Sequence, residues 1–68
     1  MNGTEFIRRT RRYARNNGLT VRIDTRYGKG SHSRLRLGNK YTLVQRGELK
    51  PGTFRAMLKQ LGIAKEDF

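Results

Sequence analysis

Between residues 19 and 45 the chain contains three short runs in which apolar and polar residues alternate, and their spacing limits the fold strongly. An alternation with a period of two is typical of strands that bury one face. The runs cover residues 19–24, 31–37 and 40–45, joined by a loop over 25–30 and a two-residue turn, Gly38-Asn39. These connections are too short for parallel crossovers, so we predict an antiparallel meander of three strands.

The alternation also predicts which side chains face the core. In the second run, Leu35 and Leu37 mark the apolar face, which Ser31 and Ser33 share. In the third run we predict that the apolar residues Tyr41 and Leu43 point inward.

Two segments with helical spacing flank the strands. Their apolar stripes are Phe6, Ile7, Thr10, Tyr13 and Ala14 in the first, and Phe54, Met57, Leu58 and Leu61 in the second. Asn2 or Thr4 can cap the first helix, Pro51 suits the first turn of the second, and Gly62 ends it. Only one face of each strand is apolar, so both helices must cover that face. We therefore predict one α+β domain over residues 1–68, ordered helix, three strands, helix, with the second sheet face basic and open.

Composition limits the partners and the chemistry. Sixteen lysines and arginines against five acidic residues give a net charge of +11, which indicates nucleic acid or an acidic protein surface as partner. No cysteine is present, and one histidine with five carboxylates argues against a zinc or two-metal site, so we expect no metal or other cofactor. No apolar run approaches the ~20 residues that span a membrane, and the lack of cysteine fits the reducing cytoplasm, where we expect the protein.

The only histidine, His32, lies in the stretch Gly-Lys-Gly-Ser-His-Ser over residues 28–33. Histidine is the side chain that most readily exchanges a proton near neutral pH. The strand alternation places His32 with Arg34 and Arg36 on the polar face, and Lys29 lies just upstream. A group that transfers protons among cations suits chemistry on a polyanion, so we predict that His32 is catalytic; the simpler interpretation is an ordinary strand residue.

Cations and exposed backbone amides near this stretch predict contacts with phosphate. We assign RNA or phosphate binding to Lys29, Gly30, Ser31, Arg34, Arg36, Gly52 and Thr53. Backbone N–H groups near Gly30, and at the start of the second helix by Gly52 and Thr53, suit an anion. Simple helix initiation explains Gly52 and Thr53 equally well, and Lys29 is also interpretable as a solvated loop residue.

Two segments carry a resemblance to a known family. Lys29-Gly30-Ser31-His32 is followed, at a characteristic distance, by Glu-Leu-Lys-Pro-Gly-Thr-Phe-Arg-Ala-Met-Leu-Lys-Gln-Leu-Gly-Ile over residues 48–63. With the Thr4-Glu5-Phe6 start, the chain resembles the HicA family of bacterial toxins, small ribonucleases that cleave messenger RNA. The resemblance implies a fold like the double-stranded-RNA-binding domain (dsRBD), His32 as the catalytic residue, and a HicB antitoxin that binds and silences the protein.

RNA carries its own nucleophile, the 2′-hydroxyl, so cleavage without metal requires a base, an acid and charge stabilisation at the phosphate. His32 supplies the base or the acid, and Ser31 or water remain candidates for the second proton transfer. Three other functions fit a basic domain of this order: a non-catalytic RNA-binding module, a DNA-binding three-stranded sheet, and a ribosome-associated structural protein. None of these requires a histidine that transfers protons.

Overall fold

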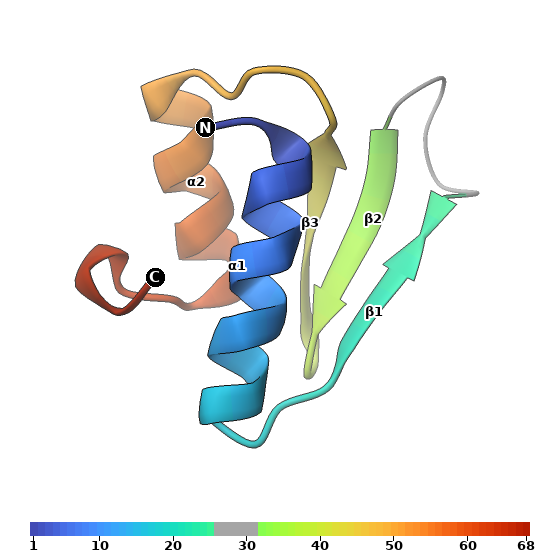
Figure 1. Ribbon diagram of the computed structural model, residues 1–68, viewed down its shortest axis with the longest axis vertical. Helices are drawn as coiled ribbons and strands as arrows, with labels where there is room; N and C mark the ends of the chain where they lie inside the picture. The colour runs from blue at the N-terminus through green and yellow to red at the C-terminus, as the bar shows by residue number, and fades with distance from the viewer. Residues whose placement is uncertain (26–31) are drawn as a thin grey trace.

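The computed structural model describes residues 1–25 and 32–68. Its elements follow the predicted order (Figure 1): α1 Gly3–Asn16, β1 Val21–Asp24, β2 His32–Leu37, β3 Lys40–Gln45, α2 Pro51–Leu61 and a short 3₁₀ helix, η2 Lys65–Asp67. The first strand begins two residues later than predicted, and Leu19 remains 43% exposed ahead of it. The α+β prediction is confirmed, and the arrangement is consistent with a dsRBD-like fold.

The sheet is an antiparallel meander in the order β1-β2-β3. Gly38 and Asn39 form the turn between β2 and β3, which pairs Leu37 with Lys40. Gly38 has a φ of 60°, a conformation that glycine adopts without the steric cost of a Cβ. Glycine at the first position of a two-residue hairpin turn is typical of type II′, whose twist matches that of the strands. The turn therefore sets the register of the hairpin.

The predicted facing of β3 is wrong. Tyr41 and Leu43 are 51% and 53% exposed, whereas Thr42 and Val44 are 1% and 0% exposed. The register explains the difference, because Leu35 lies directly opposite Thr42, and antiparallel partners project from the same face. Apolar character alone suggested the opposite assignment, but the hairpin turn determines which residues of β3 face the core.

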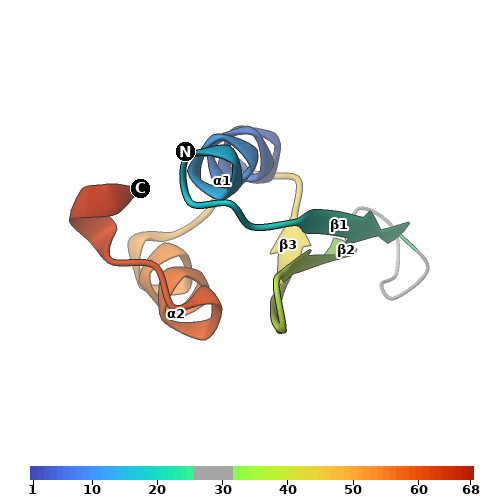
Figure 2. The same cartoon turned by 90° about the horizontal axis from the view of Figure 1, so that it is seen from below.

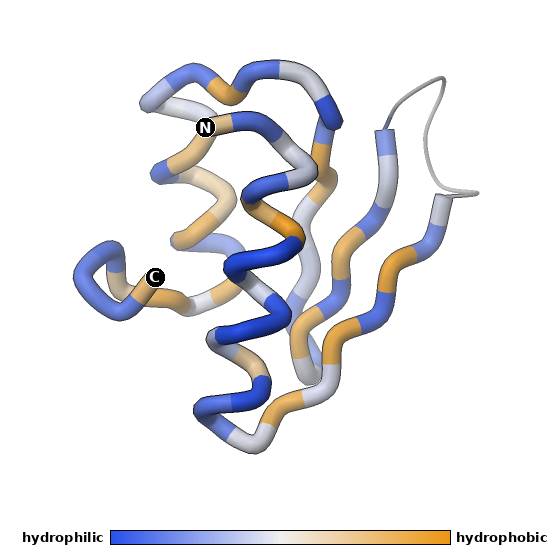
Figure 3. The backbone as a smooth tube through the Cα atoms, viewed as in Figure 1, coloured by the Kyte–Doolittle hydropathy of each residue, from blue (hydrophilic) through white to orange (hydrophobic). Residues whose placement is uncertain are grey.

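Both helices cover the face of the sheet that carries Leu35 and Leu37, as predicted (Figure 2). Along β1 and β2, hydrophobic and hydrophilic residues alternate, and the side of α1 turned toward the viewer is largely hydrophilic (Figure 3). In α1 the buried residues include Phe6, Thr10 and Ala14, all from the predicted stripe. Asn2 caps this helix, because its side chain accepts a hydrogen bond of 2.8 Å from the backbone N–H of Glu5.

The beginning of α1 is held against the end of β3 by a close backbone approach. The N–H of Gly3 donates to the carbonyl oxygens of Arg46 and Gly47, at 3.2 and 3.0 Å. A Cβ at Gly3 would lie 1.9 Å from the carbonyl oxygen of Gln45, which no backbone can accommodate without moving. Only glycine therefore permits α1 to lie this close to the strand end.

Three phenylalanine rings join the two helices to the C-terminal segment. The centroid of the fully buried Phe6 ring lies 6.0 Å from that of Phe54 and 4.9 Å from that of Phe68. Phe54 and Phe68 are themselves 5.7 Å apart. Such distances are typical of favourable aromatic pairs. Phe68 is itself buried, so the C-terminal segment closes this end of the core.

Gly62 ends α2 in the left-handed conformation, with a φ of 71°. The N–H of Ile63 then donates to the carbonyl of Leu58 at 2.9 Å, as in a Schellman-type helix end, and Ile63 is buried. Within residues 1–25 and 32–68, neither helix has the length and apolar content that crossing a membrane would require.

Candidate nucleic-acid interface

The sheet face away from the helices, here called the open face, is predominantly basic. Residues that pair directly across antiparallel strands share a face, so the register identifies its members. They are Arg22 and Asp24 from β1, His32, Arg34 and Arg36 from β2, and Tyr41, Leu43 and Gln45 from β3. Each of these residues is exposed or half-buried. Three guanidinium groups and one carboxylate therefore share this surface with the histidine.

His32 opens β2 and lies directly opposite Gln45 of β3. Its side chain is exposed, whereas the next residue, Ser33, is buried on the helix side of the sheet at 2% exposure. The imidazole therefore contributes nothing to the hydrophobic core and is accessible to a ligand on the open face. Arg34 and Arg36 follow on the same face, as the alternation predicted.

Arg34 and Tyr41 form a stacked pair on the open face. The guanidinium carbon of Arg34 lies 4.1 Å from the centroid of the Tyr41 ring, a cation–π geometry. The two residues are diagonal neighbours, because Arg34 pairs with Leu43 and Tyr41 pairs with Arg36. Arg36 is oriented separately, since its Nε donates to the carbonyl of Gly38 at 3.2 Å. The two arginines are thus held by different contacts, one by an aromatic ring and one by the turn.

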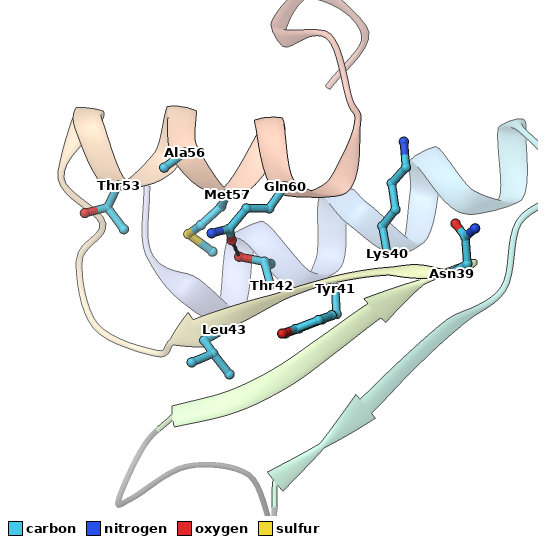
Figure 4. Close-up of a pocket in the computed structure, with 9 residues that line it drawn as sticks. All are labelled: Asn39, Lys40, Tyr41, Thr42, Leu43, Thr53, Ala56, Met57 and Gln60. Atoms are coloured by element: carbon cyan, nitrogen blue, oxygen red, sulfur yellow. Dashed lines mark hydrogen bonds between the residues drawn. The ribbon is translucent and has the colours of Figure 1, made fainter.

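Tyr41 and Leu43 also line a groove between β3 and α2 (Figure 4). The groove has a volume of about 690 Å³, and its other lining residues are Asn39, Lys40, Thr42, Thr53, Ala56, Met57 and Gln60. At its floor the hydroxyl of Thr42 donates to the side-chain oxygen of Gln60, which ties the strand to the helix. The exposed apolar residues of β3 therefore lie where the open face meets this groove.

Comparison with known proteins identifies the family. The model of a protein family described as the HicA toxin of bacterial toxin–antitoxin systems matches residues 7–63, which is most of the chain. The chain belongs to the HicA toxin family. Searches of curated proteins and of solved structures gave no match. Membership makes the protein the toxin of a toxin–antitoxin system, which pairs with an antitoxin.

Of the candidate site residues predicted in this HicA-family chain, the structure brings His32, Arg34 and Arg36 together on the open face. Gly52 and Thr53 lie in the first turn of α2, which is separated from β2 by β3 (Figures 1 and 2). Both are exposed, and Thr53 lines the groove beside β3. The predicted residues Lys29, Gly30 and Ser31 lie outside the described residues.

The arginine-rich helix α1 of this toxin forms a second basic surface, on the helix side of the sheet. Part of it has a structural role, because Arg8 forms an ion pair with Glu5, and the Arg9 guanidinium lies 4.8 Å from the centroid of the Phe68 ring. The hydrogen bond from Arg8, together with the positive charges of Arg8, Arg9 and Arg12, lowers the pKa of Glu5. Arg8 and Arg9 thus make contacts within the protein itself, so the open face is the stronger candidate for the nucleic-acid interface.

The exposure of Tyr41 and Leu43 was not predicted from the sequence. Both were assigned to the core because they are apolar. The Gly38-Asn39 turn was the signal that would have found them. A two-residue hairpin pairs the residues on either side of it, here Leu37 with Lys40. Lys40 therefore shares the face of Leu37, and the next residue, Tyr41, points to the other face of the sheet.

Proposed function

We propose that this HicA-family toxin is an endoribonuclease that cleaves messenger RNA without metal, with His32 as its general acid or base. The observation that carries the proposal is the exposed histidine on the same open face as Arg34 and Arg36. Family membership supports a toxic activity, and the net charge of +11 suits a polyanionic substrate. Messenger RNA follows from the family resemblance.

The reaction that fits these residues is transfer within the RNA backbone. The 2′-oxygen forms a bond to the adjacent phosphorus, the bond to the 5′-oxygen breaks, and the products are a 2′,3′-cyclic phosphate and a 5′-hydroxyl. His32 either takes the proton of the 2′-hydroxyl or gives one to the leaving 5′-oxygen. Arg34, two residues along β2 from His32, stabilises the charge that develops on the phosphate, and Arg36, further along the strand, binds a neighbouring phosphate.

The remaining proposed contacts extend this site. Lys29 and the backbone at Gly30 precede His32 in the chain and hold the phosphate, while Ser31 or water completes the second proton transfer. Gly52 and Thr53 offer the amides of the first turn of α2 to a more distant phosphate of the same strand. The exposed side chain of Thr53 and its place in the groove beside β3 support this extension.

Cleavage by this chemistry is expected to persist in excess chelator and to fail when the nucleophile is removed. A substrate with 2′-deoxyribose at the mapped cleavage position should bind with unchanged affinity but remain intact, because no 2′-hydroxyl is present to attack. Gel analysis of the products should reveal 2′,3′-cyclic phosphate or 3′-phosphate ends. The same oligonucleotide with the deoxyribose two positions away is the matched control, and it should be cleaved normally.

Cleavage of the deoxy-substituted position, or complete loss of activity with chelator, would overturn this mechanism. An RNA that binds tightly and is never cleaved would instead favour the non-catalytic RNA-binding module. That function requires the basic faces of the fold but has no use for an exposed histidine.

We further propose that the antitoxin is HicB-like and that it silences the toxin by covering the open face. A partner for a surface with three arginines is expected to be acidic where it docks. Complementary charge should accelerate association and make the association rate fall as salt is added. Occlusion of His32 is the simplest way for a bound protein to stop cleavage.

The purified complex with the partner encoded beside the toxin is expected to lack RNA cleavage. Hydrogen exchange in that complex should slow in β2, His32–Leu37, because the antitoxin excludes water from the open face. The helix α2 serves as the internal comparison, and the region around Arg55, which is exposed, should change less. An inhibited complex in which β2 exchanges as in the free toxin would show that inhibition does not act by occlusion.

A further inference from the structure

The open face carries an aromatic feature that the phosphate chemistry does not use. We propose that Tyr41, backed by Arg34, is a stacking site for an unpaired base of single-stranded RNA that extends from His32 along β2 and β3. The inference rests on the proposed function for the nature of its ligand. It adds to that function a base-binding site and a preference for single-stranded RNA.

The stacked pair is already arranged for a planar ligand. Arg34 lies 4.1 Å from the Tyr41 centroid, and 51% of Tyr41 remains exposed. Aromatic rings and guanidinium planes are the groups on which unpaired bases stack in RNA-binding proteins. A base added to this pair extends an existing stack and needs no rearrangement of the ring.

The surroundings of Tyr41 suit a nucleotide better than an apolar protein segment. Arg36 lies directly opposite Tyr41, and Arg22 lies directly opposite Arg36, so two guanidinium groups share a row with the ring. Leu43, which is 53% exposed, continues the apolar surface toward Gln45. Alternating stacking surface and cations match the alternating bases and phosphates of a single strand.

The distance from His32 separates this site from the cleavage position. His32 pairs with Gln45, which is four residues from Tyr41 along β3. With a strand rise of ~3.4 Å per residue, Tyr41 is about 14 Å from that pair. The base on Tyr41 therefore belongs to a flanking nucleotide and not to the one being cleaved, so it fixes the position of the strand and not the chemistry.

Double-stranded RNA does not fit this site. A duplex presents phosphates and 2′-hydroxyls at its surface, while the faces of its bases are stacked on one another. A ring that binds through stacking therefore selects unpaired nucleotides. The dsRBD-like order of elements is thus used here for a different kind of RNA, bound on the sheet side.

The test uses full-length His32→Ala protein, so that cleavage does not disturb equilibrium binding to a fluorescent single-stranded oligoribonucleotide. Tyr41→Ala in this background should weaken binding about 5- to 150-fold, the range measured for the loss of one stacked base. Tyr41→Phe should retain most of the affinity, because phenylalanine preserves the ring. Leu19→Ala removes a comparably exposed apolar side chain ahead of β1 and should leave affinity unchanged.

Salt dependence distinguishes stacking from charge. Replacing Arg36 by alanine should reduce the slope of log affinity against log salt by ~0.7 for each phosphate that the protein no longer neutralises. Tyr41→Ala should lower affinity without changing that slope, since stacking releases no counterions. A base-paired version of the oligonucleotide should lose its sensitivity to Tyr41→Ala.

Three results would overturn the inference: unchanged RNA binding by Tyr41→Ala, equal weakening on single-stranded and duplex RNA, or an effect confined to binding of the antitoxin. The last result would assign Tyr41 to the protein interface. If the wild-type chain never cleaves RNA but the Tyr41 variants behave as expected, the stacking site stands and the nuclease proposal fails. If the wild-type chain cleaves RNA normally but binding does not depend on Tyr41, the nuclease proposal stands and the stacking site fails.

Discussion

Replacing His32 by alanine is expected to slow RNA cleavage by about 100- to 10,000-fold, the contribution of one positioned acid or base. The free energy of unfolding should barely change, because the imidazole is exposed on the open face and outside the core. RNA affinity should fall little, since the arginines remain in place. In cells the variant should no longer arrest growth. Single-turnover cleavage rates, thermal unfolding and binding titrations measure the effects on cleavage, stability and RNA affinity separately.

A conservative replacement and a distant one sharpen the result. His32→Gln keeps a hydrogen-bonding side chain of similar length but does not transfer protons at neutral pH, so it should be as inactive as alanine. Asn16→Ala removes an exposed polar side chain at the end of α1 and should cleave like wild type. Full cleavage by purified His32→Ala would remove this residue from the mechanism. A sharp loss of stability in the same variant would assign it a structural role.

The order of elements was predictable because local signals agree with one another. Asn2 caps α1, Pro51 begins α2 and Gly62 ends it, and each was visible as a residue type at the boundary of a periodic pattern. The turn at Gly38 and Asn39 completed the topology. Signals of this kind act within a few residues, so they can be recognised in the amino-acid sequence without knowledge of the fold.

The facing of β3 was not predicted correctly because two signals conflicted there. Tyr41 and Leu43 are the more apolar residues, but Thr42 occupies the buried position opposite Leu35. The cost of burying a threonine is reduced by the hydrogen bond from its hydroxyl to Gln60. A polar residue thus became part of the interior because α2 supplied an acceptor, and that acceptor is 18 residues away in the sequence.

The candidate site likewise has features that the sequence predicts and features that only the fold reveals. The shared face of His32, Arg34 and Arg36 follows from alternation within one strand, so it was predictable. The stack of Arg34 on Tyr41 depends on the register between two strands. The close approach at Gly3 depends on how α1 crosses the end of β3. Contacts of this kind, between separate elements, can be identified only once the fold is known, and they determine how the basic residues are arranged.

Phe6→Ala is expected to abolish toxicity by a different physical route. Phe6 is completely buried and contacts two other rings, so truncation leaves a cavity at the junction of α1, α2 and the C-terminal segment. Such substitutions cost about 3–5 kcal/mol. A chain of this length has a total stability of about 3–10 kcal/mol, so much of the protein should unfold. Circular dichroism with thermal and chemical denaturation measures the loss.

Phe6→Leu provides the graded control, because it retains most of the buried volume and should lose less stability than alanine. Ile7→Ala, at the half-buried edge of the same helix, should also cost less. An antitoxin that binds only folded toxin lowers the free energy of the native state, so it should raise the melting temperature of Phe6→Leu. His32→Ala should lose cleavage while folded, whereas Phe6→Ala should lose it because the fold is lost. A Phe6→Ala chain that melts like wild type would show that the ring cluster does not support the domain.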